Sequence, residues 1–110
     1  MWLNKNNYLD YLNGISVIEV SGNSCANCIT LMPILHQIIS NRNDAKLYHV
    51  EANEENIEIL SKLEIDSIPS ILVLYNDTVV SRCRGYQPEE ILELWLDAKL
   101  EEIKKNQQTY

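Results

Sequence analysis

Two cysteines separated by two residues, Cys25 and Cys28, have the spacing in this sequence that best suits chemistry. Three positions is nearly one helical turn, so the two sulfurs can approach bonding distance with little change in the backbone. Cys25 follows a short run of turn-forming residues and begins a segment with helical apolar spacing. The unpaired N–H groups and positive end of that helix would favour a thiolate at Cys25, while Cys28, one turn further in, would be shielded. An exposed sulfur would then attack a disulfide, and the sheltered one would release the mixed disulfide.

Two other interpretations of the pair are small core residues placed by chance and half of a zinc site. Zinc would need a second Cys or His pair at ligand spacing, and Cys83, His36 and His49 each stand alone in the sequence. We therefore favour redox chemistry and expect neither a metal nor a bound cofactor. Because no phosphate loop or dinucleotide fingerprint is present, electrons must come from a separate reductase or a low-molecular-weight thiol.

The elements that would position the pair alternate between strand and helix. The strand at 15–20 is nearly continuous in apolar character, as expected for a strand covered on both faces. Along the chain we predict a helix within 2–12, a strand at 15–20, a helix at 25–40, a strand at 46–51 and a helix at 54–63. A hairpin of 71–75 and 78–83, a helix from Pro88 to about 103 and a frayed tail at 106–110 follow. This order predicts one α/β domain over 1–110, with helices on both faces of a central mixed sheet that closes with an antiparallel hairpin.

Composition limits the partners and the compartment. The net charge of −7 argues against direct, phosphate-neutralising contact with nucleic acid, which draws its affinity from clustered Lys and Arg, and it disfavours anionic membrane surfaces. Three cysteines, two of them close together, are not the framework of a secreted scaffold and indicate a reducing compartment. No secretory leader and no long apolar run is visible, so we expect a cytoplasmic protein. We also expect a monomer.

The sequence resembles the thioredoxin family over nearly its whole length. Cys25-Ala26-Asn27-Cys28 looks like the active-site motif of the family, and Pro33 stands where the family has its helix-kinking proline. Ile68-Pro69-Ser70 is similar to the Ile/Val-Pro-Thr element, and Gly85 to the glycine after the last strand. The resemblance implies a thioredoxin fold and a protein-disulfide reductase-type activity, in which a redox-active Cys25–Cys28 disulfide exchanges with disulfide-bearing protein substrates.

The resemblance also implies roles for residues around the pair. The Ile68–Pro69 bond would be cis and lie against Cys25, with the backbone of Ile68 pairing to a substrate segment. Glu19 stands where the family has a buried carboxylate, usually Asp, and would take the proton of Cys28; the alternative is a solvated Glu on a less covered strand face. The expected substrate-binding surface consists of Ser24, Ala26, Asn27, Ile68, Pro69, Arg84 and Gly85.

The sequence departs from the family at two places. Ser24 replaces a tryptophan, and Ala26-Asn27 replace Gly-Pro between the cysteines. Both changes alter the redox potential, so they leave open whether the protein is a reductant, an isomerase or an oxidant, although a cytoplasmic location favours reduction. A thioredoxin-fold module that only binds or senses redox state is the alternative function.

Three further residues have chemistry-bearing side chains. Cys83 lies between Arg82 and Arg84, which would favour a regulatory thiolate if the sulfur were exposed; an incidental strand cysteine is the favoured interpretation. His36 and His49 receive no role from the sequence.

Overall fold

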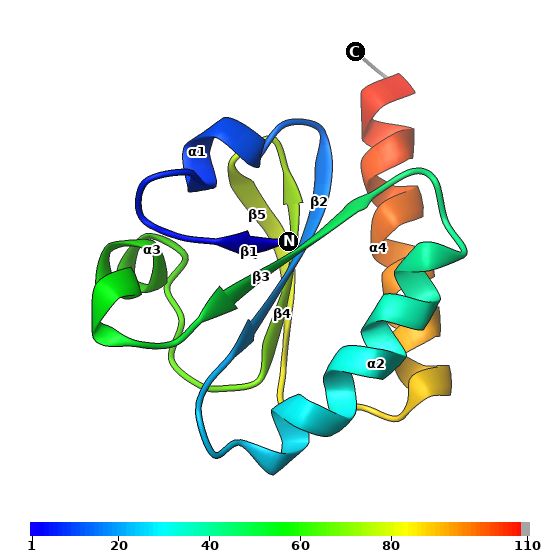
Figure 1. Cartoon of the computed structure of the whole chain (residues 1–110). Coiled ribbons are helices and arrows are strands. Elements are labelled where there is room, and N and C mark those ends of the chain that lie inside the picture. The colour runs from blue at the N-terminus through cyan, green and yellow to red at the C-terminus, as the bar shows by residue number, and fades with distance from the viewer. Residues whose placement is uncertain (109–110) are drawn as a thin grey trace.

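A computed structural model describes residues 1–108 and shows a five-stranded mixed sheet with helices on both faces (Figure 1). The strand order is β1-β3-β2-β4-β5; β1 and β2 run parallel to β3, and β4 runs antiparallel to β2 and β5. The predicted fold class is therefore confirmed. The elements are β1 (Trp2–Leu3), α1 (Tyr8–Tyr11), β2 (Ile15–Ser21), α2 (Ala26–Ser40), β3 (Lys46–Glu51), a 3₁₀ turn η1 (Glu54–Asn56), α3 (Ile57–Lys62), β4 (Ser70–Tyr75), β5 (Thr78–Arg84) and α4 (Glu89–Gln108).

Strand β2 lies in the middle of the sheet and separates two apolar cores. Its side chains alternate between the faces, as the pleat of a strand requires. Val17 packs into the core under α2 and α4, whereas Ile18 and Val20 pack into the core with residues of α1 and α3. Figure 1 shows α2 and α4 together on one side of the sheet and α1 and α3 on the other. Glu19, two positions after Val17, therefore belongs to the α2 side.

Helices α2 and α4 cover that side of the sheet with regular apolar stripes. Helix α2 continues through Pro33, and the kink at this proline stays a prediction. In α4 the buried stripe is Leu92, Leu96, Leu100 and Ile103, which repeats every three or four residues as an amphipathic helix requires.

The N-terminal segment differs from the prediction. Trp2 and Leu3 form a strand instead of the first turn of a helix, and α1 spans only four residues. The reason is the free edge of β3: Trp2 and Leu3 pair in parallel with His49 and Val50, and the His49 N–H donates to the carbonyl of Met1 at 2.8 Å. Pairing with the edge of β3 gives hydrogen-bond partners to backbone N–H and C=O groups that would lack them in a single short helical turn.

The helix predicted at 54–63 also differs in detail. Asn53 caps its beginning, because its side chain accepts the N–H of Asn56 at 3.1 Å. The first turn is a 3₁₀ turn, which has three residues per turn and so shifts the phase of the following helix. Ile57, Leu60 and Leu63 have the spacing of one apolar helix face, but Ile57 is exposed, and Ile59 and Leu63 are buried.

The C-terminal helix is longer than predicted. Residues 106–108 are helical, so the frayed tail is wrong for these positions; 109–110 lie outside the described residues. The helix continues because tertiary packing has already started it, and the segment contains neither Gly nor Pro. None of the helices within residues 1–108 is long and apolar enough to span a membrane.

Candidate active site

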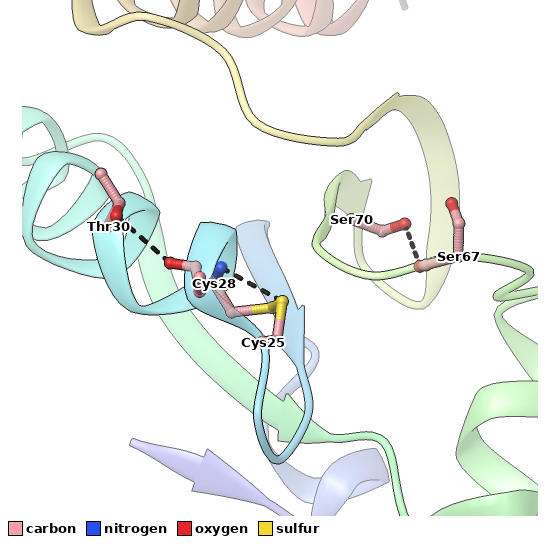
Figure 2. The surroundings of a disulfide bond; sticks show 6 residues. Cys25, Cys28, Thr30, Ser67 and Ser70 are labelled. Carbon is pink, nitrogen blue, oxygen red and sulfur yellow. Dashed lines mark hydrogen bonds between the residues drawn. A yellow bond between two sulfur atoms is a disulfide. The ribbon is translucent and has the colours of Figure 1, made fainter.

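The two cysteines occupy the beginning of α2, where β2 has ended and the loop turns toward the helix (Figure 2). Cys25 is the N-cap residue, and its sulfur accepts the backbone N–H of Cys28 at 3.2 Å. The two residues form a disulfide with a Cα–Cα separation of 5.2 Å. Cys28 is only 2% exposed, whereas Cys25 is half-buried. The predicted difference in shelter between the two sulfurs is therefore present.

The loop before Cys25 lies against the segment that carries Pro69. A Cβ atom built on Gly22 would lie 2.7 Å from Cδ1 of Ile68, so the glycine allows this close approach. Ser24, next to Cys25, is exposed and has a left-handed φ of 59°. Ala26 and Asn27 are exposed in the first turn of α2. Ile68 thus borders the loop that leads to Cys25.

The Ile68–Pro69 bond is cis, as the resemblance implies. Two hydrogen bonds hold this turn: the Gly85 N–H donates to the carbonyl of Pro69 at 2.7 Å, and the hydroxyl of Ser70 donates to the carbonyl of Ser67 at 2.7 Å. Figure 2 shows Ser67 and Ser70 on the loop across from the cysteines. Gly85 has a φ of 84°, which a residue with a Cβ rarely adopts.

Arg84 belongs to the same edge, but its side chain turns to the neighbouring loop. Its Nε donates to Asp66 Oδ1 at 2.8 Å, and both side chains are exposed. The structure therefore brings Ile68, Pro69 and Gly85 together with the cysteine loop. The Arg84 guanidinium lies next to them but is bound to Asp66.

Glu19 is completely buried, so the alternative of a solvated carboxylate is wrong. Its Oε1 lies 2.8 Å from Nδ1 of His49, and Nε2 of His49 lies 2.9 Å from Nε2 of His36 on α2. Among the atoms that the structure describes, Oε2 of Glu19 has no hydrogen-bond partner. Partial burial of the His36 ring lowers the pKa of His36. The neighbouring His49 and the N-terminal amino group lower this pKa further, whereas Glu19 raises it.

The connection of the two histidines to Glu19 is not apparent from the sequence. The available signal was that Glu19 and His49 are each an ionisable residue between apolar neighbours in a predicted strand. The observation that joins them is the register of β2 against β3, in which Glu19 and His49 are direct partners. That register follows from the packed sheet and cannot be obtained from either strand alone.

Cys83 does not have the surroundings of an activated thiol. Its side chain is half-buried, and this burial raises the pKa of the Cys83 thiol. The neighbouring guanidiniums bind elsewhere, since Arg82 donates to the carbonyl of Glu64 at 3.0 Å and Arg84 pairs with Asp66. The incidental strand cysteine is the interpretation that these contacts favour.

No group of three or more His, Cys, Asp or Glu side chains within residues 1–108 is arranged to hold a metal ion. In particular, Glu19, His49 and His36 make a chain of hydrogen bonds, in which each group faces the next.

Known proteins share this architecture and part of the sequence. The thioredoxin of Staphylococcus aureus is 26% identical over 89 residues, which cover 80% of this chain and 85% of that protein. The crystal structure of Chlamydomonas reinhardtii thioredoxin f2 superimposes with a TM-score of 0.77 at 23% identity, over 86% of this chain and 91% of the other. Spinach chloroplast thioredoxin f, in its short form, has a TM-score of 0.80 at 19% identity, over 90% and 91% of the two chains.

The sequence model that describes the family, named Thioredoxin, matches residues 1–98. That match contains both cysteines, the carboxylate of β2, the cis-proline turn and Gly85. With the Cys25–Cys28 disulfide at the beginning of α2, it shows that the chain belongs to the thioredoxin family of thiol–disulfide oxidoreductases.

Proposed function

We propose that this protein reduces disulfide bonds in other proteins, with Cys25 as the attacking sulfur and Cys28 as the resolving one. The observation that carries the proposal is the unequal placement of the two sulfurs on one helix. Cys25 caps the helix, is half-buried and accepts the N–H of Cys28, an environment that stabilises a thiolate. Cys28, at 2% exposure, is close enough to bond to Cys25 and too sheltered to meet a large substrate.

The exchange has two steps with balanced electrons and protons. In the first, the Cys25 thiolate attacks one sulfur of the substrate disulfide, forms a mixed disulfide and releases the other substrate sulfur as a thiolate, which takes a proton from water. In the second, the Cys28 thiol gives up its proton and attacks the sulfur of Cys25. This forms the Cys25–Cys28 disulfide and releases the second substrate sulfur as a thiolate, which takes a proton from water, so two electrons pass to the substrate.

Glu19 is the proposed acceptor of the Cys28 proton. Support comes from its burial on the α2 side of β2 and from Oε2, which has no partner among the described atoms. Cys28 shares a face of α2 with Leu31 and Leu35, which pack with Val17 in the core on the α2 side of the sheet. The thiol of Cys28 therefore faces the same side of the sheet as Glu19. A carboxylate in that layer can accept a proton that bulk water does not reach.

The cis-proline turn is the proposed docking site of the substrate. Ile68 borders the cysteine loop at Gly22, and its side chain is exposed, whereas Pro69 is buried. An extended substrate segment could pair with this backbone and present its disulfide to Cys25. Ser24, Ala26, Asn27, Pro69, Arg84 and Gly85 complete the proposed docking surface.

The oxidised form needs an external electron donor. One structural neighbour, with a TM-score of 0.81 at 18% identity, is the thioredoxin f2 of a crystal structure of a ferredoxin:thioredoxin reductase and thioredoxin f2 complex. By analogy we propose a separate reductase or a low-molecular-weight thiol as the donor for this chain. We also propose that the protein is a monomer and that it works in a reducing cytoplasm.

Trapping experiments with insulin as the substrate test the assignment. Reduced protein is expected to cleave the insulin disulfides catalytically in the presence of dithiothreitol. Cys28→Ser is expected to accumulate a covalent complex through Cys25, visible as a shifted band on a non-reducing gel, whereas Cys25→Ser is expected to form none. A Cys25→Ser protein as active as the native one would refute the assignment. Wild-type protein without turnover, even though it folds and forms the disulfide, would favour a binding or redox-sensing module instead.

A further inference from the structure

Glu19 is connected to the protein surface by two histidine rings that the exchange chemistry described so far does not use. The connection runs from Oε1 of Glu19 to Nδ1 of His49 at 2.8 Å, and from Nε2 of His49 to Nε2 of His36 at 2.9 Å. Glu19 is 0% and His49 2% exposed, whereas His36 is an exposed residue on α2. The chain therefore begins in the core and ends in water.

The contacts around His49 hold its ring in place and keep water away from it. The ring stacks against His36, with centroids 4.9 Å apart, and packs against Trp2 of β1, with centroids 5.2 Å apart. The titratable groups that surround it are Glu19 from β2, His36 from α2 and the N-terminal amino group next to β1, which acts on His36. His49 thus has one hydrogen-bonding group on each side of its ring.

We propose that His49 and His36 form a proton relay that exchanges the proton of Glu19 with solvent while the core stays closed. Both are positioning residues, because they act through Glu19 and touch no substrate. The inference rests on the proposed role of Glu19 as the acceptor of the Cys28 proton.

Two patterns of hydrogen-bond direction satisfy the distances. In the first, Glu19 is a carboxylate: His36 donates its Nε2–H to His49 Nε2, and His49 donates its Nδ1–H to Glu19 Oε1. In the second, Glu19 is protonated: its Oε1–H donates to His49 Nδ1, and His49 donates its Nε2–H to His36 Nε2. His36 then holds its proton on Nδ1. Both rings are neutral in both patterns, and the second contains one more proton than the first.

The two patterns convert into each other by taking up or releasing one proton at the surface. Nδ1 of His36 takes a proton from water, His36 passes its Nε2 proton to His49, and His49 passes its Nδ1 proton to Glu19. The reverse sequence returns one proton to water. At the end of either sequence no additional charge remains on the buried ring of His49, so the desolvation cost of a lasting buried cation is avoided.

This exchange would serve both directions of the thiol chemistry. When Cys28 attacks Cys25, Oε2 of Glu19 accepts the Cys28 proton. Rotation of the carboxyl group exchanges its two oxygens and brings the proton to His49 Nδ1, from which the relay delivers it to solvent. When the disulfide is reduced again, the relay brings a proton in, and Glu19 supplies it to the leaving sulfur of Cys28. Without the relay, the buried carboxyl group could exchange its proton only when the core opens.

The test uses a small disulfide that reports the two steps separately. Reduced protein with Cys83→Ser, to remove the third thiol, is mixed with 5,5′-dithiobis(2-nitrobenzoate). One thionitrobenzoate leaves when Cys25 attacks, and a second leaves when Cys28 displaces it, so the second phase does not depend on reagent concentration. His36→Gln retains an N–H that can donate to His49 but cannot pass a proton on.

The relay predicts that His36→Gln slows the second phase about tenfold at pH 7 and changes the first phase by less than about twofold, since the loss is smaller than that of a general base itself. In His36→Ala, added imidazole is expected to restore the second phase, which a merely structural role would not allow. Gln37→Ala, an exposed neighbour on the same helix, is the matched control and is expected to react as the parent protein.

Glu19→Gln separates failure of the relay from failure of the proposed function. The relay predicts that Glu19→Gln slows the second phase and that adding His36→Gln slows it no further. If Glu19→Gln slows the second phase but His36→Gln does not, or imidazole has no effect on His36→Ala, the relay is wrong and Glu19 keeps its role. If Glu19→Gln leaves the second phase unchanged, the role of Glu19 and the relay both fall, while Cys25 and Cys28 remain as assigned.

Discussion

Replacing Gly85 by alanine would show whether the cis-proline turn matters for substrates as well as for the fold. Gly85 has a φ of 84°, and a Cβ built on it would meet nothing within 4 Å. The cost of Gly85→Ala is therefore purely conformational. A left-handed residue with a Cβ costs about 1–2 kcal/mol, and the reduced freedom of the unfolded chain returns about 0.4–1 kcal/mol. We expect a net loss of about 1 kcal/mol in the free energy of unfolding.

Gly14→Ala is a matched control for this substitution. Gly14 has a φ of 72° and is also open around a Cβ, but it lies before β2, at the opposite end of that strand from the cysteine loop. Both variants are expected to lose about 1 kcal/mol in urea denaturation. Only Gly85 donates its N–H to the carbonyl of Pro69, at 2.7 Å, and relief of the strained φ would turn that N–H away.

The assay compares a protein substrate with a small one. Because the turn is proposed to pair with a substrate backbone, Gly85→Ala is expected to slow insulin reduction roughly three- to tenfold through misplacement of the docking segment. It is expected to leave the reaction with 5,5′-dithiobis(2-nitrobenzoate) nearly unchanged, and Gly14→Ala to affect neither. Equal loss of insulin reduction in both glycine variants would refute the reasoning, because the effect would then come from stability alone.

Three further predictions concern stability and the third thiol. Hydrogen bonds from Arg42 and Lys104 hold the pKa of Asp44 below its ordinary 3.8, although burial opposes them, so Asp44→Asn is expected to cost about 1–2 kcal/mol in urea denaturation at pH 7. This stabilisation is present above pH 3.8 and is lost as the pH falls through the lower folded value. Asn53→Ala removes the side-chain cap of η1 and is expected to cost about 1 kcal/mol. Cys83→Ser is expected to keep full insulin reductase activity, because burial raises the pKa of that thiol.

Each of these predictions has a contrasting outcome. Asp66→Asn is the control for Asp44→Asn, since Asp66 also pairs with an arginine at 2.8 Å but both partners are exposed, and we expect a smaller loss of stability. Equal losses would show that the burial of Asp44 is irrelevant. An Asn53→Ala protein as stable as the parent would mean that water replaces the cap, and reduced insulin turnover in Cys83→Ser would give that thiol a part in the exchange.

The sequence predicts most of the elements around the cysteines because local patterns determine them. The β-branched stretch of β2 and the apolar stripes of α2 and α4 each define a face that must be buried, and this pattern can be read from the segment alone. The place of Cys25 at a helix N-terminus follows from a turn-rich segment before an apolar period. These features were predicted at nearly the right residues.

The features that the sequence did not predict depend on contacts between separate elements. The strand at Trp2 exists because the edge of β3 is open beside it, and no local pattern encodes that partner. The exposure of Ile57 follows from the phase of the preceding 3₁₀ turn. The chain from Glu19 through His49 to His36 needs the register of two strands and the placement of a helix together. Such interactions arise only when the elements have packed.

Site-resolved alkylation of the reduced protein is the most direct test of how the two sulfurs are presented. Iodoacetamide is added over a range of pH, and the modification of each cysteine is followed by peptide mass spectrometry. We predict that Cys25 reacts first, with its midpoint below the pH of about 8.5 that is typical of a free thiol, and that Cys28 reacts much more slowly. Equal rates at the two positions, or faster reaction at Cys28, would contradict the proposed division between attacking and resolving sulfur.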